Sequence, residues 1–185
     1  QYRVQPTRCL ATPCSSANGR MFLAWSPHDR VMVNVGDDAP DFSLLDHNNN
    51  TVSGSDYKGQ KVILAFFPAA FTGICTTEMC TFEQNISQLN DAGVAVLGIC
   101  VDARFANAAF VEKNGLTFPI LSDYTRSTVE AYGVALHDFA GMPGYTASER
   151  AVFIVDENGD VMWKWVGENP GVQPDYDAVV AAAGA

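Results

Sequence analysis

Two cysteines lie close together in the stretch FFPAAFTGICTTEMC, which runs from Phe66 to Cys80. Cys75 follows an apolar run typical of a buried strand and stands where a helix is expected to begin. A thiolate there would feel the positive end of the helix dipole and unpaired backbone N–H groups, and both favour the nucleophilic form. Because Cys75 also begins an apolar stripe with Met79 and Phe82, simple packing in the core is the alternative interpretation.

Cys80 is expected on a different side of the same helix. A step of five residues turns a helix by about 140°, which places Cys80 beside polar residues such as Glu83 and Gln84. A free thiol on a polar face has no packing role, which favours redox chemistry over a neutral surface cysteine. The two Cα atoms would be roughly 8.6 Å apart in a helix, whereas a disulfide needs less than about 7 Å. A bridge between Cys75 and Cys80 therefore requires the first turns of the helix to unwind.

The composition limits the classes of protein to consider. The chain has 185 residues, of which 48% are hydrophobic, enough for one domain with a core. No apolar run approaches the ~20 residues of a membrane span. Residues 32–185 carry seven basic and 20 acidic residues, so like charges argue against nucleic acid as a partner. The five cysteines are odd in number and lack the spacing of a secreted disulfide scaffold. We therefore expect a cytoplasmic protein that does not enter membranes.

Residues 1–31 differ from the rest of the chain. They have no apolar period, are rich in Pro, Ser and Arg, and carry four Arg and one Asp. This composition predicts a disordered or non-native N-terminal extension, with a transit peptide as an alternative. Cys9 and Cys14 lie there, and two thiols without further ligands are a weak zinc signal. The folded domain is expected to comprise residues 32–185.

From Met32 onward, segments with strand and helix patterns alternate. Two continuous apolar runs, KVILAFF and VAVLGICV, are typical of central strands covered on both faces. One Asn-Gly pair, Asn114-Gly115, is expected to end a helix, and a second, Asn158-Gly159, predicts a tight hairpin near the end of the chain. Strands are expected at 42–46, 51–53, 61–67, 94–101, 118–123, 150–155 and 161–166, and helices at 72–91, 103–114, around 125–132 and at 174–183. This order predicts an α/β fold: a central mixed β-sheet flanked by helices, with an N-terminal β-hairpin extension.

Pro68, Thr72 and Cys75 form the pattern P-x-x-x-T-x-x-C, which resembles the signature of the peroxiredoxin family. The segments VGDDAPDFSL, VAVLGICVD, FPILSD, EAYGV and RAVFIVDENG are also similar to that family, so the resemblance covers about residues 32–182. The stretch FPAAFTGIC is similar to the one-cysteine alkyl hydroperoxide reductase E type. The C-x-x-x-x-C spacing is similar to the bacterioferritin-comigratory (Q) type.

The resemblance implies a thioredoxin-like fold and a cofactor-free peroxidase. Its thiolate, here Cys75, would reduce hydrogen peroxide or organic hydroperoxides and become a sulfenic acid. Thr72 and backbone N–H groups near Cys75 would donate hydrogen bonds where negative charge develops. Pro68 would shield the thiolate from water, although a proline can also simply end a strand. The implied partners are a hydroperoxide, a thiol reductant such as a thioredoxin-like protein or a small thiol, and a second copy in a homodimer.

By the same resemblance, Arg150 holds the thiolate and polarises the peroxide, and Glu78 orients Arg150. If the strand that begins at Arg150 runs antiparallel to the strand before Cys75, the two residues meet. An acidic residue in a first helical turn is the alternative interpretation of Glu78. Arg126 is a second candidate arginine, although a surface charge at a helix start would explain it equally well.

Several alternatives remain at this point. Cys80 is expected to resolve the sulfenic acid as an intramolecular disulfide, and the alternative is a one-cysteine cycle without it. A thioredoxin-like disulfide reductase would need a C-x-x-C pair, which is absent, and a non-catalytic redox or chaperone module would not need the pocket residues. Cys100 is expected to be an inert core thiol. His47 and His137 lack ligand spacing to Cys75, so no metal is expected.

Overall fold

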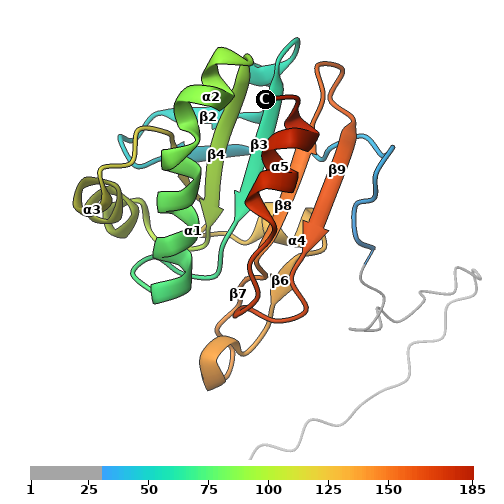
Figure 1. The fold of residues 1–185 in the computed structure, drawn as a ribbon. Helices are drawn as coiled ribbons and strands as arrows, with labels where there is room; N and C mark the ends of the chain where they lie inside the picture. Colours follow the sequence, from blue (N-terminus) through green and yellow to red (C-terminus); the bar gives the residue numbers. More distant parts are fainter. Residues whose placement is uncertain (1–30) are drawn as a thin grey trace, which may run out of the picture.

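A seven-stranded sheet forms the centre of the computed structural model, which describes residues 31–185 (Figure 1). In spatial order the strands are β2 (Thr51–Ser53), β1 (Ser43–Asp46), β5 (Ile120–Ser122), β4 (Val94–Cys100), β3 (Lys61–Phe66), β8 (Ala151–Val155) and β9 (Val161–Val166). Strand β4 is parallel to β3 and β5, and all other neighbours are antiparallel. The expected mixed sheet is confirmed, and the expected N-terminal hairpin, β1–β2, forms one edge of it. The extension predicted for residues 1–31 lies, except for its last residue, outside the described part.

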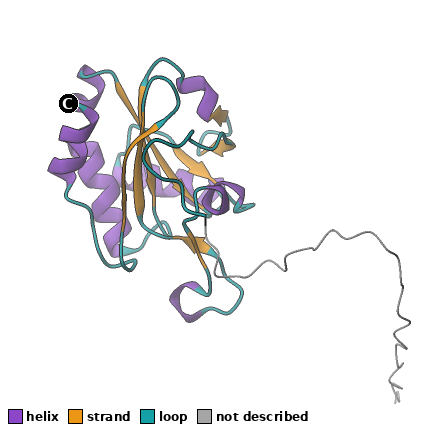
Figure 2. Cartoon of the chain, turned by 90° about the vertical axis from the view of Figure 1, so that its right-hand side faces the viewer, coloured by secondary structure: helices purple, strands orange, loops and turns teal. Residues whose placement is uncertain are grey.

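Helices cover both faces of this sheet (Figure 2). They are α1 (Gly73–Gln84), α2 (Ile86–Asp91), α3 (Arg104–Asn114), α4 (Ser127–Ala131) and α5 (Tyr176–Ala183), with short 3-10 turns at Gly54–Tyr57 and Phe139–Gly141. Helices α1, α2, α3 and α5 pack on one face, whereas α4 and the segment around Phe42 pack on the other. None of the helices within residues 31–185 is long and apolar enough to cross a membrane.

Strand β3 shows why its sequence is a continuous apolar run. Ile63 and Ala65 join the core under α1 and α5, whereas Leu64 and Phe66 join the core on the opposite face. Successive side chains of a strand point to opposite faces, so a strand covered on both faces needs apolar residues at every position. The prediction of a buried central strand is therefore confirmed.

The predicted helix over residues 72–91 is wrong in one respect, because it is broken at Asn85 into α1 and α2. The Asn85 side-chain amide donates a hydrogen bond to the Thr81 carbonyl oxygen at 2.9 Å, and the Asn85 backbone N–H donates to the same oxygen at 3.3 Å. The Asn85 backbone has φ −96° and ψ 0°, at the edge of the helical range. Asparagine competes in this way with the helical hydrogen bonds of the backbone. A small second sheet of β6 (Ala135–Leu136) and β7 (Ala147–Ser148) was not predicted either.

The two Asn-Gly signals are confirmed as turns. Gly115 has a φ of 65° and ends α3, and Gly159 has a φ of 100° in the β8–β9 turn. One carboxylate oxygen of Asp156 accepts the backbone N–H groups of Asn158, Gly159 and Asp160. The hairpin brings the end of β9 back beside the start of β8.

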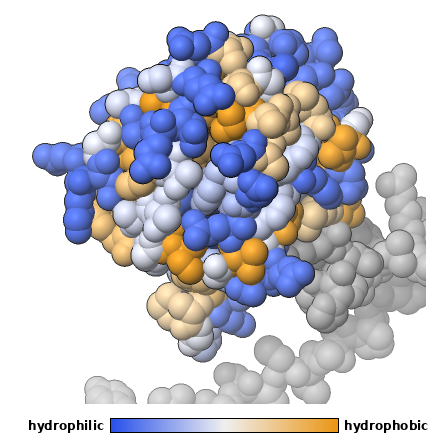
Figure 3. All heavy atoms as spheres, in the orientation of Figure 1, coloured by the Kyte–Doolittle hydropathy of each residue, from blue (hydrophilic) through white to orange (hydrophobic). Residues whose placement is uncertain are grey.

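Polar residues dominate much of the molecular surface. On the face drawn in Figure 3, hydrophobic residues lie in small groups among hydrophilic ones. Several large apolar side chains remain exposed at loops and helix starts, including Phe71, Phe105 and Met142.

Gly98, in the middle of β4, allows α1 to pack closely on the sheet. A Cβ atom at this position would lie 2.4 Å from Ile120 Cδ1 and 3.2 Å from Met79 Sδ. We predict that Gly98→Ala lowers the free energy of unfolding by about 1–3 kcal/mol, because the surrounding core must shift. Ile120→Val removes the Cδ1 atom, so the double variant should lose less stability than the sum of the two single changes. Urea unfolding of the four proteins measures this, and strict additivity would contradict it.

Candidate active site

The end of β3 and the start of α1 position Cys75. The Phe67 N–H still pairs with the Ile99 carbonyl oxygen at 3.0 Å, and Pro68 then ends the strand. Thr72 is the N-cap residue of α1, and its carbonyl oxygen accepts the Thr76 N–H at 2.9 Å. Cys75 follows in the first turn and is only 1% exposed. The sequence prediction that Cys75 lies at the helix start, on the edge of the core, is confirmed.

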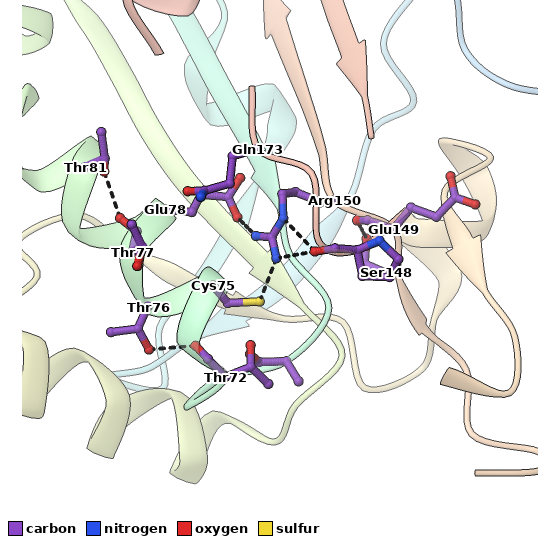
Figure 4. Close-up of polar contacts among 12 residues, drawn as sticks. Thr72, Cys75, Thr76, Thr77, Glu78, Thr81, Ser148, Glu149, Arg150 and Gln173 are labelled. Carbon is purple, nitrogen blue, oxygen red and sulfur yellow. Dashed lines mark hydrogen bonds and ion pairs between the residues drawn. The ribbon is translucent and has the colours of Figure 1, made fainter. Parts of the chain in front are cut away.

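Arg150 lies next to Cys75, although 75 residues separate the two in the sequence. Strands β3 and β8 are antiparallel and Phe66 pairs with Ala151, so the residue before β8 lies beside the end of β3. The Arg150 Nη2 group donates a hydrogen bond to the Cys75 sulfur at 3.3 Å (Figure 4). The Cys75 sulfur therefore accepts a charge-assisted hydrogen bond from the guanidinium.

Two groups besides the Cys75 sulfur hold the guanidinium of Arg150, a residue that is only 2% exposed. Nη1 donates to the Glu78 Oε2 atom, and the two form an ion pair. Nε and Nη2 donate to the Pro170 carbonyl oxygen at 3.2 and 2.9 Å. With these partners the guanidinium plane is fixed, and Nη2 points at the sulfur.

Glu78 lies one turn after Cys75 on α1 and is 0% exposed. Burial raises the pKa of the Glu78 carboxyl to about 7, while the charge of Arg150 and its hydrogen bond act in the opposite direction. The second oxygen, Oε1, has no hydrogen-bond partner among the described residues. Glu78 accepts a hydrogen bond from Nη1 of Arg150, whereas Nη2 donates to the Cys75 sulfur. Glu78 does not line the pocket described next.

A pocket of about 250 Å³ opens above the Cys75 sulfur. It is lined by Pro68, Thr72, Gly73, Ile74, Cys75, Phe139, Arg150, Pro170 and Gly171. The structure thus brings together four of the residues singled out from the sequence, Pro68, Thr72, Cys75 and Arg150, with Glu78 directly behind Arg150. Because the sulfur is buried, a reagent must enter this pocket to reach it.

The Thr72 hydroxyl has a different orientation from the one expected. It donates a hydrogen bond to the Ala69 carbonyl oxygen at 3.0 Å, and a carbonyl can only accept. The hydroxyl proton is therefore engaged by the Ala69 carbonyl oxygen. Thr72 can donate to a molecule in the pocket only after rotation of this hydroxyl.

Five pocket residues were not singled out from the sequence: Gly73, Ile74, Phe139, Pro170 and Gly171. The last two were within reach of prediction, because the β8–β9 hairpin returns the chain to Arg150. The Gly167 N–H indeed donates to the Arg150 carbonyl oxygen at 2.9 Å, and residues 169–171 follow directly. Phe139 lies in the segment between β6 and β7, for which the sequence carried no signal.

Cys80 is half-buried on α1, rather than fully on a polar face. Cys75, Cys80 and Cys100, the cysteines of the described residues, are all free thiols. The helix is intact between Cys75 and Cys80, so a disulfide between them would require unwinding, as expected.

The other candidates lie away from the pocket. Arg126 donates from Nε to the Thr146 carbonyl oxygen at 3.2 Å and ties the start of α4 to a loop. Cys100 donates to Asn107 Oδ1 at 3.2 Å, and burial raises its pKa, as suits an inert core thiol. His47 is half-buried, and its Nδ1 atom accepts the Ile120 N–H at 3.3 Å. His137 is exposed and bonds to Thr146 Oγ1. Within residues 31–185, no three His, Cys, Asp or Glu side chains are grouped to hold a metal ion.

Comparison with known proteins adds an independent observation. The model of the AhpC/TSA family matches residues 35–164. The peroxiredoxin Bcp of Escherichia coli is 37% identical over 130 residues, which are 70% of this chain and 83% of Bcp. A Mycobacterium tuberculosis relative assigned to the peroxiredoxins is 41% identical over 129 residues, which are 69% of this chain and 81% of the relative.

A solved structure has the same fold. The crystal structure of a peroxiredoxin-like protein from Aquifex aeolicus superimposes with a TM-score of 0.74 at 26% sequence identity. The match covers 83% of this chain and 87% of that chain. The expected thioredoxin-like fold, a mixed sheet with flanking helices, is therefore confirmed.

The buried carboxyl of Glu78 should make the free energy of unfolding depend on pH. Its pKa is about 7 in the folded protein against an ordinary value of 4.5, so the folded state holds the proton more tightly. We predict that this residue's contribution to stability is full below pH 4.5 and is lost as the pH rises toward 7. The Glu78→Gln variant keeps an acceptor for Arg150 but has no carboxyl group to titrate. The part of the pH dependence of stability that Glu78 causes should therefore disappear.

Urea unfolding of the reduced protein between pH 4 and 8 measures this effect. The difference in unfolding free energy between wild type and Glu78→Gln should change by roughly 2–4 kcal/mol over the range, because one pKa unit corresponds to about 1.4 kcal/mol. Glu112→Gln, an exposed change on α3, is the control. Parallel curves for wild type and Glu78→Gln would show that Glu78 does not titrate as described.

Proposed function

This chain belongs to the AhpC/TSA family and is a peroxiredoxin, a thiol-dependent peroxidase, and we propose that Cys75 is the thiol that reduces the peroxide. One observation carries this assignment: a fully buried guanidinium donates a hydrogen bond to the Cys75 sulfur inside a pocket. A structural cysteine has no need of a buried positive charge, because burying a charge is costly unless its partners compensate.

In the proposed reaction the Cys75 thiolate attacks the terminal oxygen of a hydroperoxide. A sulfur–oxygen bond forms as the oxygen–oxygen bond breaks, so sulfur is oxidised to a sulfenic acid and the peroxide is reduced. The leaving hydroxide or alkoxide takes a proton from water and departs as water or an alcohol. Arg150 and the N–H groups at the start of α1 stabilise the negative charge that develops on oxygen. Thr72 joins them when its hydroxyl turns from Ala69 toward the peroxide.

The pocket supports small hydroperoxides as substrates. Its volume of about 250 Å³ holds several molecules the size of water. Arg150 supplies a polar side, whereas Pro68, Ile74 and Phe139 supply apolar walls. We expect hydrogen peroxide and compact organic hydroperoxides to reach the sulfur.

Cys80 is the proposed resolving thiol. Its sulfur would attack the Cys75 sulfenic acid, so that a disulfide forms and water leaves, and an external thiol donor would then reduce the disulfide. The helix between the two cysteines is weak by composition. Thr76, Thr77 and Thr81 each donate their hydroxyl to the carbonyl four residues earlier, at 2.9, 3.1 and 2.8 Å. Figure 4 shows the bonds of Thr76 and Thr81. Such bonds slightly destabilise a helix, which favours the unwinding that the disulfide requires.

The remaining proposals rest on the resemblance to the family. A thioredoxin-like protein or a small thiol is the proposed reductant, a homodimer the proposed assembly, and the cytoplasm the proposed location. The alternative functions are a one-cysteine cycle and a non-catalytic redox or chaperone module.

The assignment of Cys75 is tested by intact mass after one equivalent of hydrogen peroxide, with alkylation of the remaining thiols. We predict the loss of two alkylatable thiols without added oxygen, mapped to Cys75 and Cys80. Cys75→Ser should consume no peroxide and keep its other thiols. Peroxide consumption by Cys75→Ser at the wild-type rate would refute the assignment, and an unreactive wild type would favour the non-catalytic module.

The role of Cys80 has a separate test. In Cys80→Ser, one equivalent of peroxide should react at an unchanged rate, because Cys80 does not line the pocket. One oxygen should then remain on Cys75, and turnover supported by a dithiol protein donor should be lost. Undiminished turnover in this variant would establish the one-cysteine cycle instead.

A further inference from the structure

We propose that Phe71 is a positioning residue that holds the loop of residues 68–72 against α3 and thereby keeps Pro68 and Thr72 in the pocket. The proposal rests on the function assigned to Cys75 above. Phe71 itself does not line the pocket, so it would act only through its neighbours in the chain.

The backbone of Phe71 is held in an unfavourable conformation. Its φ is 64°, in the left-handed region, where a side chain with a Cβ atom is disfavoured and glycine is the usual residue. A bulky aromatic residue stays there only where its surroundings compensate. Because Phe71 is 50% exposed, burial in the core cannot be the whole compensation.

The ring of Phe71 provides the compensating contacts. Its edge-to-face contact with Phe110 of α3 has a centroid distance of 5.4 Å, and Phe110 in turn stacks on Phe67 at 6.0 Å. The Lys113 ammonium lies 5.7 Å from the centre of the Phe71 ring. Aromatic pairs and cation–π contacts of this kind are favourable even at partly exposed sites. The Phe71 side chain is thus docked on two residues of α3.

The residue before Phe71 is tied to the same region. The Ala70 N–H donates to the Asp102 carboxylate at 2.7 Å, and Asp102 lies between β4 and α3. Thr72, directly after Phe71, is the N-cap residue of α1. Release of Phe71 from α3 would leave the Ala70–Asp102 hydrogen bond as one remaining tie, so the loop that carries Pro68 and Thr72 would be held less firmly.

This arrangement meets two opposed requirements of the proposed cycle. Oxidation of Cys75 needs the loop in place, whereas a disulfide with Cys80 needs the first turns of α1 to unwind. The contacts of the Phe71 ring with α3 hold the loop in place, whereas the strained Phe71 backbone favours its release. The two requirements are therefore met by the same residue. Phe71 would then adjust the balance between the two arrangements.

Three variants separate docking from strain. Phe71→Ala removes the ring but keeps a Cβ atom in the left-handed conformation, whereas Phe71→Gly removes both the ring and the strain. Phe105→Ala is the matched control, because Phe105 also lies at α3, is 70% exposed and has its ring contact with the neighbouring Arg104. Global stability is measured in parallel by urea unfolding.

The first readout is hydrogen exchange of the reduced protein, followed in the peptide that covers residues 70–77. In Phe71→Ala we expect exchange about tenfold faster than in wild type, from the usual strength of an aromatic pair with a cation–π contact. In Phe71→Gly it should be several-fold slower than in Phe71→Ala, and in Phe105→Ala it should match wild type. Unchanged exchange in Phe71→Ala, or faster exchange in Phe71→Gly than in Phe71→Ala, would overturn the proposal.

The second readout is the rate of Cys75 oxidation by hydrogen peroxide. It should fall in the order wild type, Phe71→Gly, Phe71→Ala, with no change in Phe105→Ala, and the rate of disulfide formation after oxidation should rise in the same order. A lower oxidation rate without the rise would indicate general damage and count against a positioning role. If the protein consumed no peroxide but the exchange order held, the proposed function would fail, whereas the docking of Phe71 would stand.

Discussion

The buried positive charge of Arg150 is the constraint on which the arrangement of this molecule depends. A guanidinium removed from water is stable only where acceptors surround it, and here they are Glu78, the Pro170 carbonyl oxygen and the Cys75 sulfur. These three partners come from the middle of α1, the loop after β9 and the start of α1. Each must therefore lie within hydrogen-bond distance of the start of β8, which the mixed sheet makes possible.

The sheet provides this precision because both of its faces are covered. Strands β3 and β8 are antiparallel neighbours in a closely packed core, so the relative position of Cys75 and Arg150 cannot vary freely. Around this rigid centre lie segments that are easier to disturb: the strained loop at Phe71 and the threonine-rich first half of α1. In the proposed cycle the rigid part fixes the reacting atoms, and the weaker part allows the second cysteine to approach.

Much of the fold and of the site could be predicted, because the sequence patterns that indicate them each lie within a few neighbouring residues. The apolar runs of β3 and β4, the two Asn-Gly turns and the P-x-x-x-T-x-x-C pattern were each visible in a short stretch. Arg150 required a resemblance and an assumed strand direction, which the sheet confirms. The break at Asn85 was missed because the apolar period of the helix continues past it, whereas the Asn85 side chain competes with its own backbone N–H for the Thr81 carbonyl oxygen.

The sequence by itself determined most of the helices and strands, the cysteine at the start of a helix and four residues of the pocket, because periodicity and spacing act over a few residues. Only the tertiary structure decided how the charges and hydrogen bonds are satisfied. The carbonyl oxygen of Pro170 holds Arg150 although a carbonyl carries no side-chain signal, and the Thr72 hydroxyl points to Ala69. Such contacts join segments far apart in the chain, and they exist only once the sheet has brought those segments together.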